Sequence, residues 1–114
     1  MKAYTDIKQS QKLVEILPLE SADMRYHTIS HYNSTPCHEI IYTVEFDRAK
    51  DRDIPCWSLA ALIEALPKIY LLKPILDLEE NSILYSGTDL DVRADNIIDA
   101  CVEMLIKLHE LKML

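Results

Sequence analysis

The residue types best suited to binding a transition metal gather in one short stretch of the chain. Imidazole nitrogens and cysteine thiolates are the usual ligands of zinc, and this stretch holds His27, His31, Cys37 and His38. If it forms a β-hairpin, His27 and His31 share a strand face, whereas the adjacent Cys37 and His38 point in opposite directions. The spacing also lacks the paired cysteines of a zinc ribbon. We therefore favour ordinary hairpin surface residues over a metal site, and we predict no cofactor.

Other arrangements for catalysis find less support in the chain. A thiol enzyme would need Cys37, Cys56 or Cys101 to meet a histidine, and nothing local enforces that meeting. Cys56 adjoins Trp57 and Cys101 falls on an apolar helix face, so we expect both to be packing residues. The single glycine excludes a glycine-rich phosphate loop. A noncatalytic protein is the favoured interpretation, and a small metal-dependent or thiol enzyme is kept as an alternative.

Acidic side chains are concentrated late in the chain. Residues 77–103 hold eight acidic side chains and one basic side chain, which accounts for the whole formal net charge of −7. Four of the acids are spaced by four residues, so we expect them to climb one side of the last helix, where like charges repel by about 0.2–0.5 kcal/mol per pair. These four are Asp91, Asp95, Asp99 and Glu103.

This acidic stripe is our candidate for binding a basic protein partner, although a solvated helix face is the simpler interpretation. Direct binding of nucleic acid is disfavoured, because clustered lysines and arginines are missing. The stripe could instead imitate spaced phosphates, so a nucleic-acid-mimicking inhibitor of a DNA-binding protein is a further alternative.

Two groups of apolar residues suggest other surfaces. Trp57, Tyr70 and Tyr85 could line a pocket, since aromatic residues combine an apolar body with a polar group, but such residues more often complete a core. The tail at 105–114 has apolar residues on more than one face. That pattern leaves a surface for another protein or a second subunit to cover, so a homodimer is plausible.

Five elements are expected to position these residues in a single domain spanning 1–114. The first helix begins at a Thr5 cap, the central helix follows Pro55, and Asp91 caps the last helix. In order, we predict a helix at 5–17, a hairpin with arms 25–32 and 39–46, a helix at 55–67, a second hairpin, and a helix at about 91–112. The second hairpin has one arm at 69–72, which could extend to 75–76, and the other at 83–85; Pro74 indicates an edge strand or a break. The predicted fold class is α+β, helix-hairpin-helix-hairpin-helix, with a mostly antiparallel sheet packed against helices.

Hydropathy and cysteine usage bear on location. No apolar run approaches the ~20 residues that span a bilayer, and the first residues lack the apolar segment of a signal peptide. Three widely spread cysteines do not suggest a disulfide framework. We therefore predict a cytoplasmic protein that does not enter a membrane.

Three blocks of the chain carry a resemblance. They are 19–24 (LESADM), 55–67 and 94–98 (ADNII) with the helix that follows, and Pro-Cys-Trp-Ser-Leu at 55–59 is the most specific. Together they resemble a group of uncharacterised small proteins of bacterial mobile elements and phages. The resemblance implies no catalytic residue, ligand or cofactor. Our leading hypothesis is an accessory or interaction protein that binds a protein partner through its acidic last helix or its apolar tail.

Overall fold

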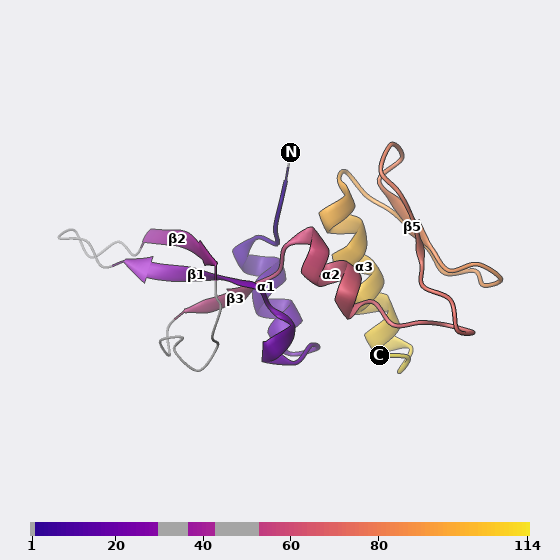
Figure 1. Cartoon of the computed structure of the whole chain (residues 1–114), viewed down its shortest axis with the longest axis horizontal. Helices are drawn as coiled ribbons and strands as arrows, with labels where there is room; N and C mark the ends of the chain where they lie inside the picture. Colours follow the sequence, from indigo (N-terminus) through magenta and orange to yellow (C-terminus); the bar gives the residue numbers. More distant parts are fainter. Residues whose placement is uncertain (1, 30–36, 43–52) are drawn as a thin grey trace.

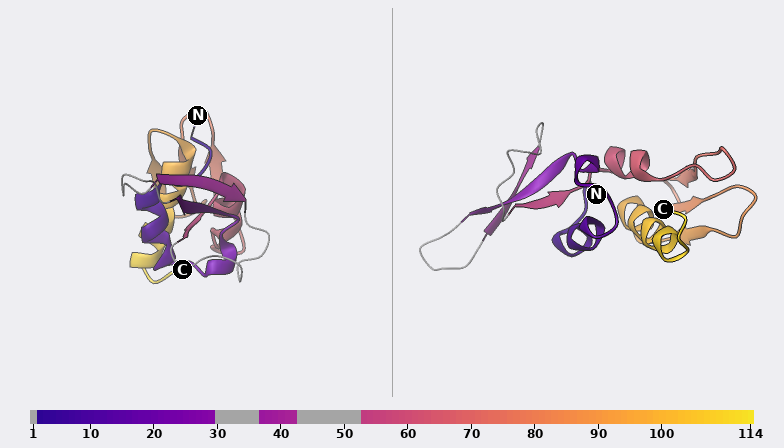
Figure 2. Two further views of the ribbon diagram at one scale, coloured as in Figure 1. Left: turned by 90° about the vertical axis from the view of Figure 1, so that its left-hand side faces the viewer. Right: turned by 90° about the horizontal axis from the view of Figure 1, so that it is seen from below.

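Helices lie between two small sheets in the computed structural model, which describes residues 2–29, 37–42 and 53–114 (Figure 1). In chain order the elements are α1 (Ile7–Val14), the 3-10 helix η1 (Leu19–Ser21), β1 (Met24–Ile29), β2 (Cys37–Tyr42), β3 (Ile54–Cys56), α2 (Leu59–Ala65), β4 (Ile75–Asp77), β5 (Ser82–Leu84), β6 (Asp91–Arg93) and α3 (Ile97–Glu110). Sheet β2-β1-β3 and sheet β4-β5-β6 lie at opposite ends, with the helices between them (Figure 2).

The predicted fold class is wrong. The chain is α+β, but its described strands form two separate antiparallel sheets of three strands each, where we predicted hairpins alternating with helices around one sheet. Each predicted hairpin gains a third strand, β3 or β6, and each of these is three residues long. A strand this short has no visible alternation in the sequence. Pro55 lies inside β3, which is tolerated because β3 is an edge strand.

The predicted helix starts are also wrong. α1 is capped by Asp6, whose carboxylate accepts the Gln9 N–H while the Gln9 side chain accepts the Asp6 N–H. Thr5, the predicted cap, is instead fully buried. α2 is capped by Ser58 and so begins later than Pro55. Thr5 and Asp6 can both cap a helix, and tertiary packing decides between them, whereas the start at Pro55 was predicted because proline is common at the first helical position.

The core is built around α3. Eight of its fourteen residues are buried, and the helix packs against α1, α2, β5 and β6. The sequence predicts an apolar face for this helix made of Ala94, Ile97, Ile98, Cys101, Leu105 and Leu108. The last five are buried in α3, whereas Ala94 precedes the helix and is only partly buried. Within the described ranges, no helix combines the length and the apolar character needed to cross a bilayer.

Candidate interaction surface

The acidic residues do not form the predicted stripe. Asp91 lies in β6 and Asp95 in the connection that follows, so only Asp99 and Glu103 belong to α3. The reason is that the helix begins at Ile97, with Asn96 as its cap in place of Asp91. Regular spacing in the sequence therefore does not become regular spacing along one helix.

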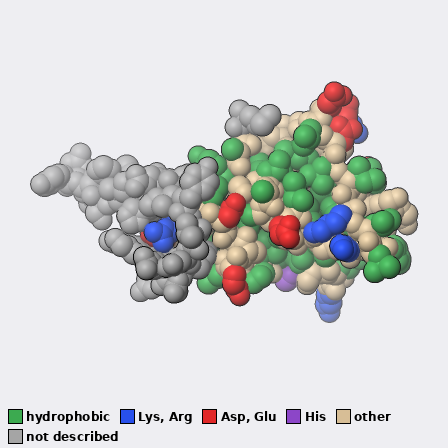
Figure 3. Space-filling view, in the orientation of Figure 1, with side chains coloured by type: hydrophobic (Ala, Val, Ile, Leu, Met, Phe, Trp, Pro, Cys, Tyr) green, Lys and Arg blue, Asp and Glu red, His purple; other side chains and the backbone are tan. Residues whose placement is uncertain are grey.

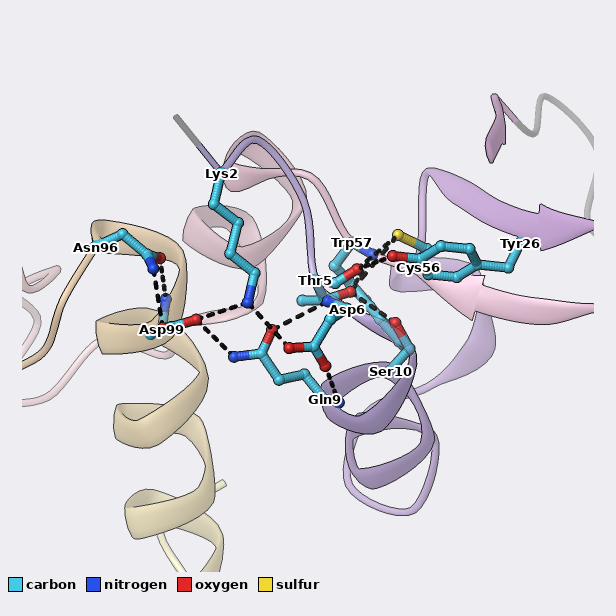
Figure 4. Close-up of polar contacts among 10 residues, drawn as sticks. All are labelled: Lys2, Thr5, Asp6, Gln9, Ser10, Tyr26, Cys56, Trp57, Asn96 and Asp99. Carbon is cyan, nitrogen blue, oxygen red and sulfur yellow. Dashed lines mark hydrogen bonds and ion pairs between the residues drawn. The ribbon is translucent and has the colours of Figure 1, made fainter. Parts of the chain in front are cut away.

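Asp99 is occupied by contacts within the chain (Figure 4). Its Oδ1 accepts hydrogen bonds from Lys2 Nζ and Gln9 Nε2, both at 2.8 Å, and its Oδ2 accepts one from Asn96 at 2.9 Å. Lys2 Nζ also lies 3.1 Å from Asp6 Oδ2. These contacts fasten the N-terminal segment and α1 to the start of α3, so Asp99 has a structural role.

This arrangement predicts a pH dependence of stability. Partial burial pushes the pKa of Asp99 upward, but hydrogen bonds from Lys2 and Gln9 outweigh it, so the pKa lies below the ordinary 3.8. The pKa of Asp6 is lowered as well, because hydrogen bonds from Gln9 and Lys2 outweigh its burial. A lowered folded-state pKa stabilises the fold above the unfolded-state pKa, and this stabilisation disappears as the pH falls through the folded-state value. We expect Asp99→Asn to cost about 0.5–1 kcal/mol at neutral pH and progressively less below about pH 4.

Urea denaturation of the wild type and of the Asp99→Asn variant, at neutral pH and at acid pH, measures this difference in the free energy of unfolding. Glu103→Gln is the matched control, because Glu103 is an exposed acid on the same helix. Equal stability of the Asp99→Asn and Glu103→Gln variants at neutral pH would contradict the structural role of Asp99.

The three aromatic residues predicted to line a pocket have different surroundings. Trp57 is completely buried, and its indole N–H donates to Ser21 Oγ at 2.9 Å. Tyr85 is also buried, and its hydroxyl donates to the Pro67 carbonyl at 2.7 Å. Tyr70 is 80% exposed. Trp57 and Tyr85 therefore belong to the core, and Tyr70 alone is a surface residue.

The candidate metal ligands are described only in part. His31 lies outside the described residues, and for His27, Cys37 and His38 the structure gives the strand register alone. In that register His27 is opposite Glu39 and His38 is opposite Thr28. Among the described residues, no group of three or more His, Cys, Asp or Glu side chains is placed to hold a metal ion.

Two cysteine thiols are described, and both are inaccessible. Cys56 and Cys101 are fully buried. Burial raises the pKa of both thiols, that of Cys101 to about 12. A nucleophilic cysteine needs access and thiolate character, so neither of these two residues is suited to covalent catalysis.

An exposed apolar turn lies between α2 and β4, and the sequence analysis did not predict it. Ile69 and Leu72 exchange two backbone hydrogen bonds, of 2.9 and 3.0 Å, around Tyr70 and Leu71. The two central residues have positive φ angles of 53° and 68°, which defines a type I′ turn. This turn favours Asn-Gly, and bulky residues in it carry strain of about 1–3 kcal/mol each. Leu71 is nevertheless 90% exposed, so burial within the chain does not offset the strain.

A groove of about 320 Å³ lies beside this turn and is lined by Ile69, Tyr70, Thr88, Asp89, Leu90, Leu111 and Met113. Its apolar lining combines the buried Ile69 and Leu90 with Leu111 and Met113 of the C-terminal tail, which are about half exposed. We call the exposed residues Tyr70, Leu71, Leu72, Leu111 and Met113 the turn surface. They bring together the predicted apolar tail and the turn.

A second groove, of about 390 Å³, separates η1 from α2. Its lining consists of Glu20, Ser21, Asp23, Ala60, Ala61, Glu64 and Ala65. Asp23 accepts hydrogen bonds from the Ser58 backbone N–H and from the Ser58 hydroxyl, so it supports the start of α2. This groove thus combines small side chains with carboxylates, one of which is already bonded within the fold.

Comparison with known proteins matches the chain to no family model, no curated protein and no solved structure. The choice of a functional surface therefore depends on the geometry of the described residues. Among the surfaces above, the turn surface combines exposed apolar side chains, backbone strain and an adjoining groove. We take it as the candidate functional site.

Proposed function

We propose that this chain is a noncatalytic interaction protein that binds a protein partner through the turn surface. The observation that carries the proposal is the strained and exposed pair Tyr70–Leu71. Strained backbone persists only where the surrounding structure enforces it, and it concentrates at functional sites. Exposure to water does not stabilise an apolar turn of this kind, so binding to another protein is the best explanation for it.

Burial of the turn against a partner would offset its backbone strain and remove its apolar side chains from water. Removing a large apolar side chain from water contributes about 1.5–3 kcal/mol, which is comparable to the strain at each turn residue. The adjoining groove provides a concave site for a protruding apolar side chain of the partner. A convex turn beside a concave groove is the combination that gives close packing at an interface.

The other interpretations from the sequence have less support. Binding through the acidic last helix, and imitation of nucleic acid, both depend on a regular stripe, whereas Asp91 and Asp95 lie outside α3 and Asp99 is paired. A metal-dependent or thiol enzyme gains no support from the described cysteines. A cytoplasmic location and the resemblance to mobile-element and phage proteins remain predictions.

The proposal is tested by a double variant, Tyr70→Asn with Leu71→Gly. Asn-Gly is the preferred pair for this turn, so we expect the variant to gain about 1–2 kcal/mol of stability, because the relieved strain exceeds the conformational entropy that the new glycine loses on folding. It also removes the two most exposed apolar side chains of the described residues. We therefore expect a more stable protein that no longer captures its partner in a quantitative pull-down from the native host.

Leu78→Asn is the matched control, because Leu78 is 64% exposed and lies outside the turn surface. It should keep the partner that the double variant loses. Retention of the partner by the double variant would refute the turn surface as the binding site, and loss cannot be ascribed to misfolding if urea denaturation shows the expected gain in stability.

A further inference from the structure

We infer that the protein bound at the turn surface is a second copy of this chain, arranged about a two-fold axis. This inference rests on the proposed function and names its partner. In a two-fold dimer each copy presents the same surface, so that surface must be complementary to itself. The turn surface meets this condition, because its protruding turn and its groove lie side by side and share Tyr70.

The protruding part of the surface is Leu71, which is 90% exposed at the end of the turn. The receiving part is the groove, whose apolar lining includes Leu90, Leu111 and Met113. At about 320 Å³ the groove is at the small end of the ~300–1,000 Å³ range of ligand pockets. It thus has room for one or two apolar side chains, such as the Leu71 side chain of the second copy.

Charges around the turn surface are complementary under the same two-fold relation. Lys68 is exposed beside the turn, whereas the groove is lined by one acid, Asp89. Placing the turn of one copy in the groove of the other therefore brings Lys68 toward Asp89 twice, once on each side of the axis. Figure 3 shows basic side chains next to hydrophobic ones on the half of the molecule that holds the second sheet.

The size of the surface indicates a weak dimer. Standard interfaces use ~20–30 residues from each partner, and the turn surface provides far fewer. We expect a reversible dimer that dissociates on dilution. Because each copy carries a net charge of −7, long-range repulsion opposes the association and salt screens it. Salt also screens the two Lys68–Asp89 contacts, so the two effects oppose each other and added salt should change the dimer little, in contrast to the binding of a basic partner by an acidic surface.

Sedimentation velocity of the full chain, from low-micromolar to near-millimolar concentration, tests the inference. We expect the wild type to shift from monomer to dimer over this range. Leu71→Asp should remain monomeric throughout, whereas the control Leu78→Asp should dimerise like the wild type. A wild type that stays monomeric, or a Leu71→Asp variant that still dimerises, would overturn the inference.

A charge exchange tests the two-fold geometry itself. Lys68→Glu and Asp89→Lys should each weaken self-association, because each variant places like charges at both contacts. An equimolar mixture of these two variants should recover dimers, because both contacts then join opposite charges. Failure of the mixture to recover dimers would overturn the proposed arrangement. The proposed function would survive if the wild type is monomeric and the pull-down still finds a different protein that the Asn-Gly variant loses.

Discussion

Replacement of Trp57 with alanine is expected to lower the free energy of unfolding by about 3–5 kcal/mol. Trp57 has no exposed surface and belongs to the same buried cluster as Leu62 and Leu105. Its removal leaves a cavity in the core and ends the hydrogen bond from the indole to Ser21. Because domains of this size are stable by only about 5–15 kcal/mol, the alanine variant should be close to unfolding at room temperature.

Urea denaturation followed by circular dichroism measures this loss, with Trp57→Phe as the control. Phenylalanine keeps most of the buried aromatic area and loses the indole N–H, so its cost should be clearly smaller than that of alanine. A loss below about 1 kcal/mol for Trp57→Ala would mean that the residue lines an open pocket, as the sequence alone allowed.

Thr5→Val is expected to cost about 2–4 kcal/mol, although the two side chains have nearly the same shape. The buried Thr5 hydroxyl lies 2.8 Å from Ser10 Oγ, and it accepts a hydrogen bond of 3.1 Å from the Trp57 backbone N–H (Figure 4). Its Oγ1 also lies 3.6 Å from the thiol of Cys56. Valine leaves the Ser10 hydroxyl and the Trp57 N–H buried without this partner, at about 1–3 kcal/mol for each group.

Two comparisons separate the contribution of the Thr5 hydroxyl to stability from that of its methyl group. Thr5→Ser keeps the hydroxyl and removes one methyl group, so it should cost only about 1 kcal/mol. In a Ser10→Ala background, Thr5→Val should cost less than in the wild type, because the Ser10 hydroxyl, one of the two groups that lose their partner, is then absent. Equal costs for the valine and serine variants in urea denaturation would show that the hydroxyl contributes little.

The parts of the fold that could be predicted from the sequence are those with long patterns. The apolar face of α3 repeats over several turns and is buried as expected. β1 and β2, with six residues each, pair in the antiparallel arrangement expected of a hairpin. In both cases many residues follow the same hydrophobic periodicity, so one residue that departs from it does not change the prediction.

The parts that could not be predicted depend on single residues or on distant contacts. Asp91 and Asn96 are both good caps, and the pairing of β6 with β5 decides that Asp91 lies in a strand. The turn at Tyr70–Leu71 has no Asn or Gly to mark it, so the sequence suggested a strand arm at 69–72. Pro74 indicated an edge strand or a break, but it lies after the turn and does not mark the turn itself.

The contacts of Asp99 also bear on the order in which the protein can fold during its synthesis. Lys2 is separated from Asp99 by 97 residues, and Gln9 by 90 residues. A ribosome therefore releases the first helix long before the Asp99 carboxylate that joins it to α3 has been made. Native structure that depends on such distant pairs forms slowly and only once the late segment is present. The newly made N-terminal segment first meets β1 and β3, where Thr5 bonds to Tyr26 and Trp57, and its contacts with Asp99 form only after α3 has emerged.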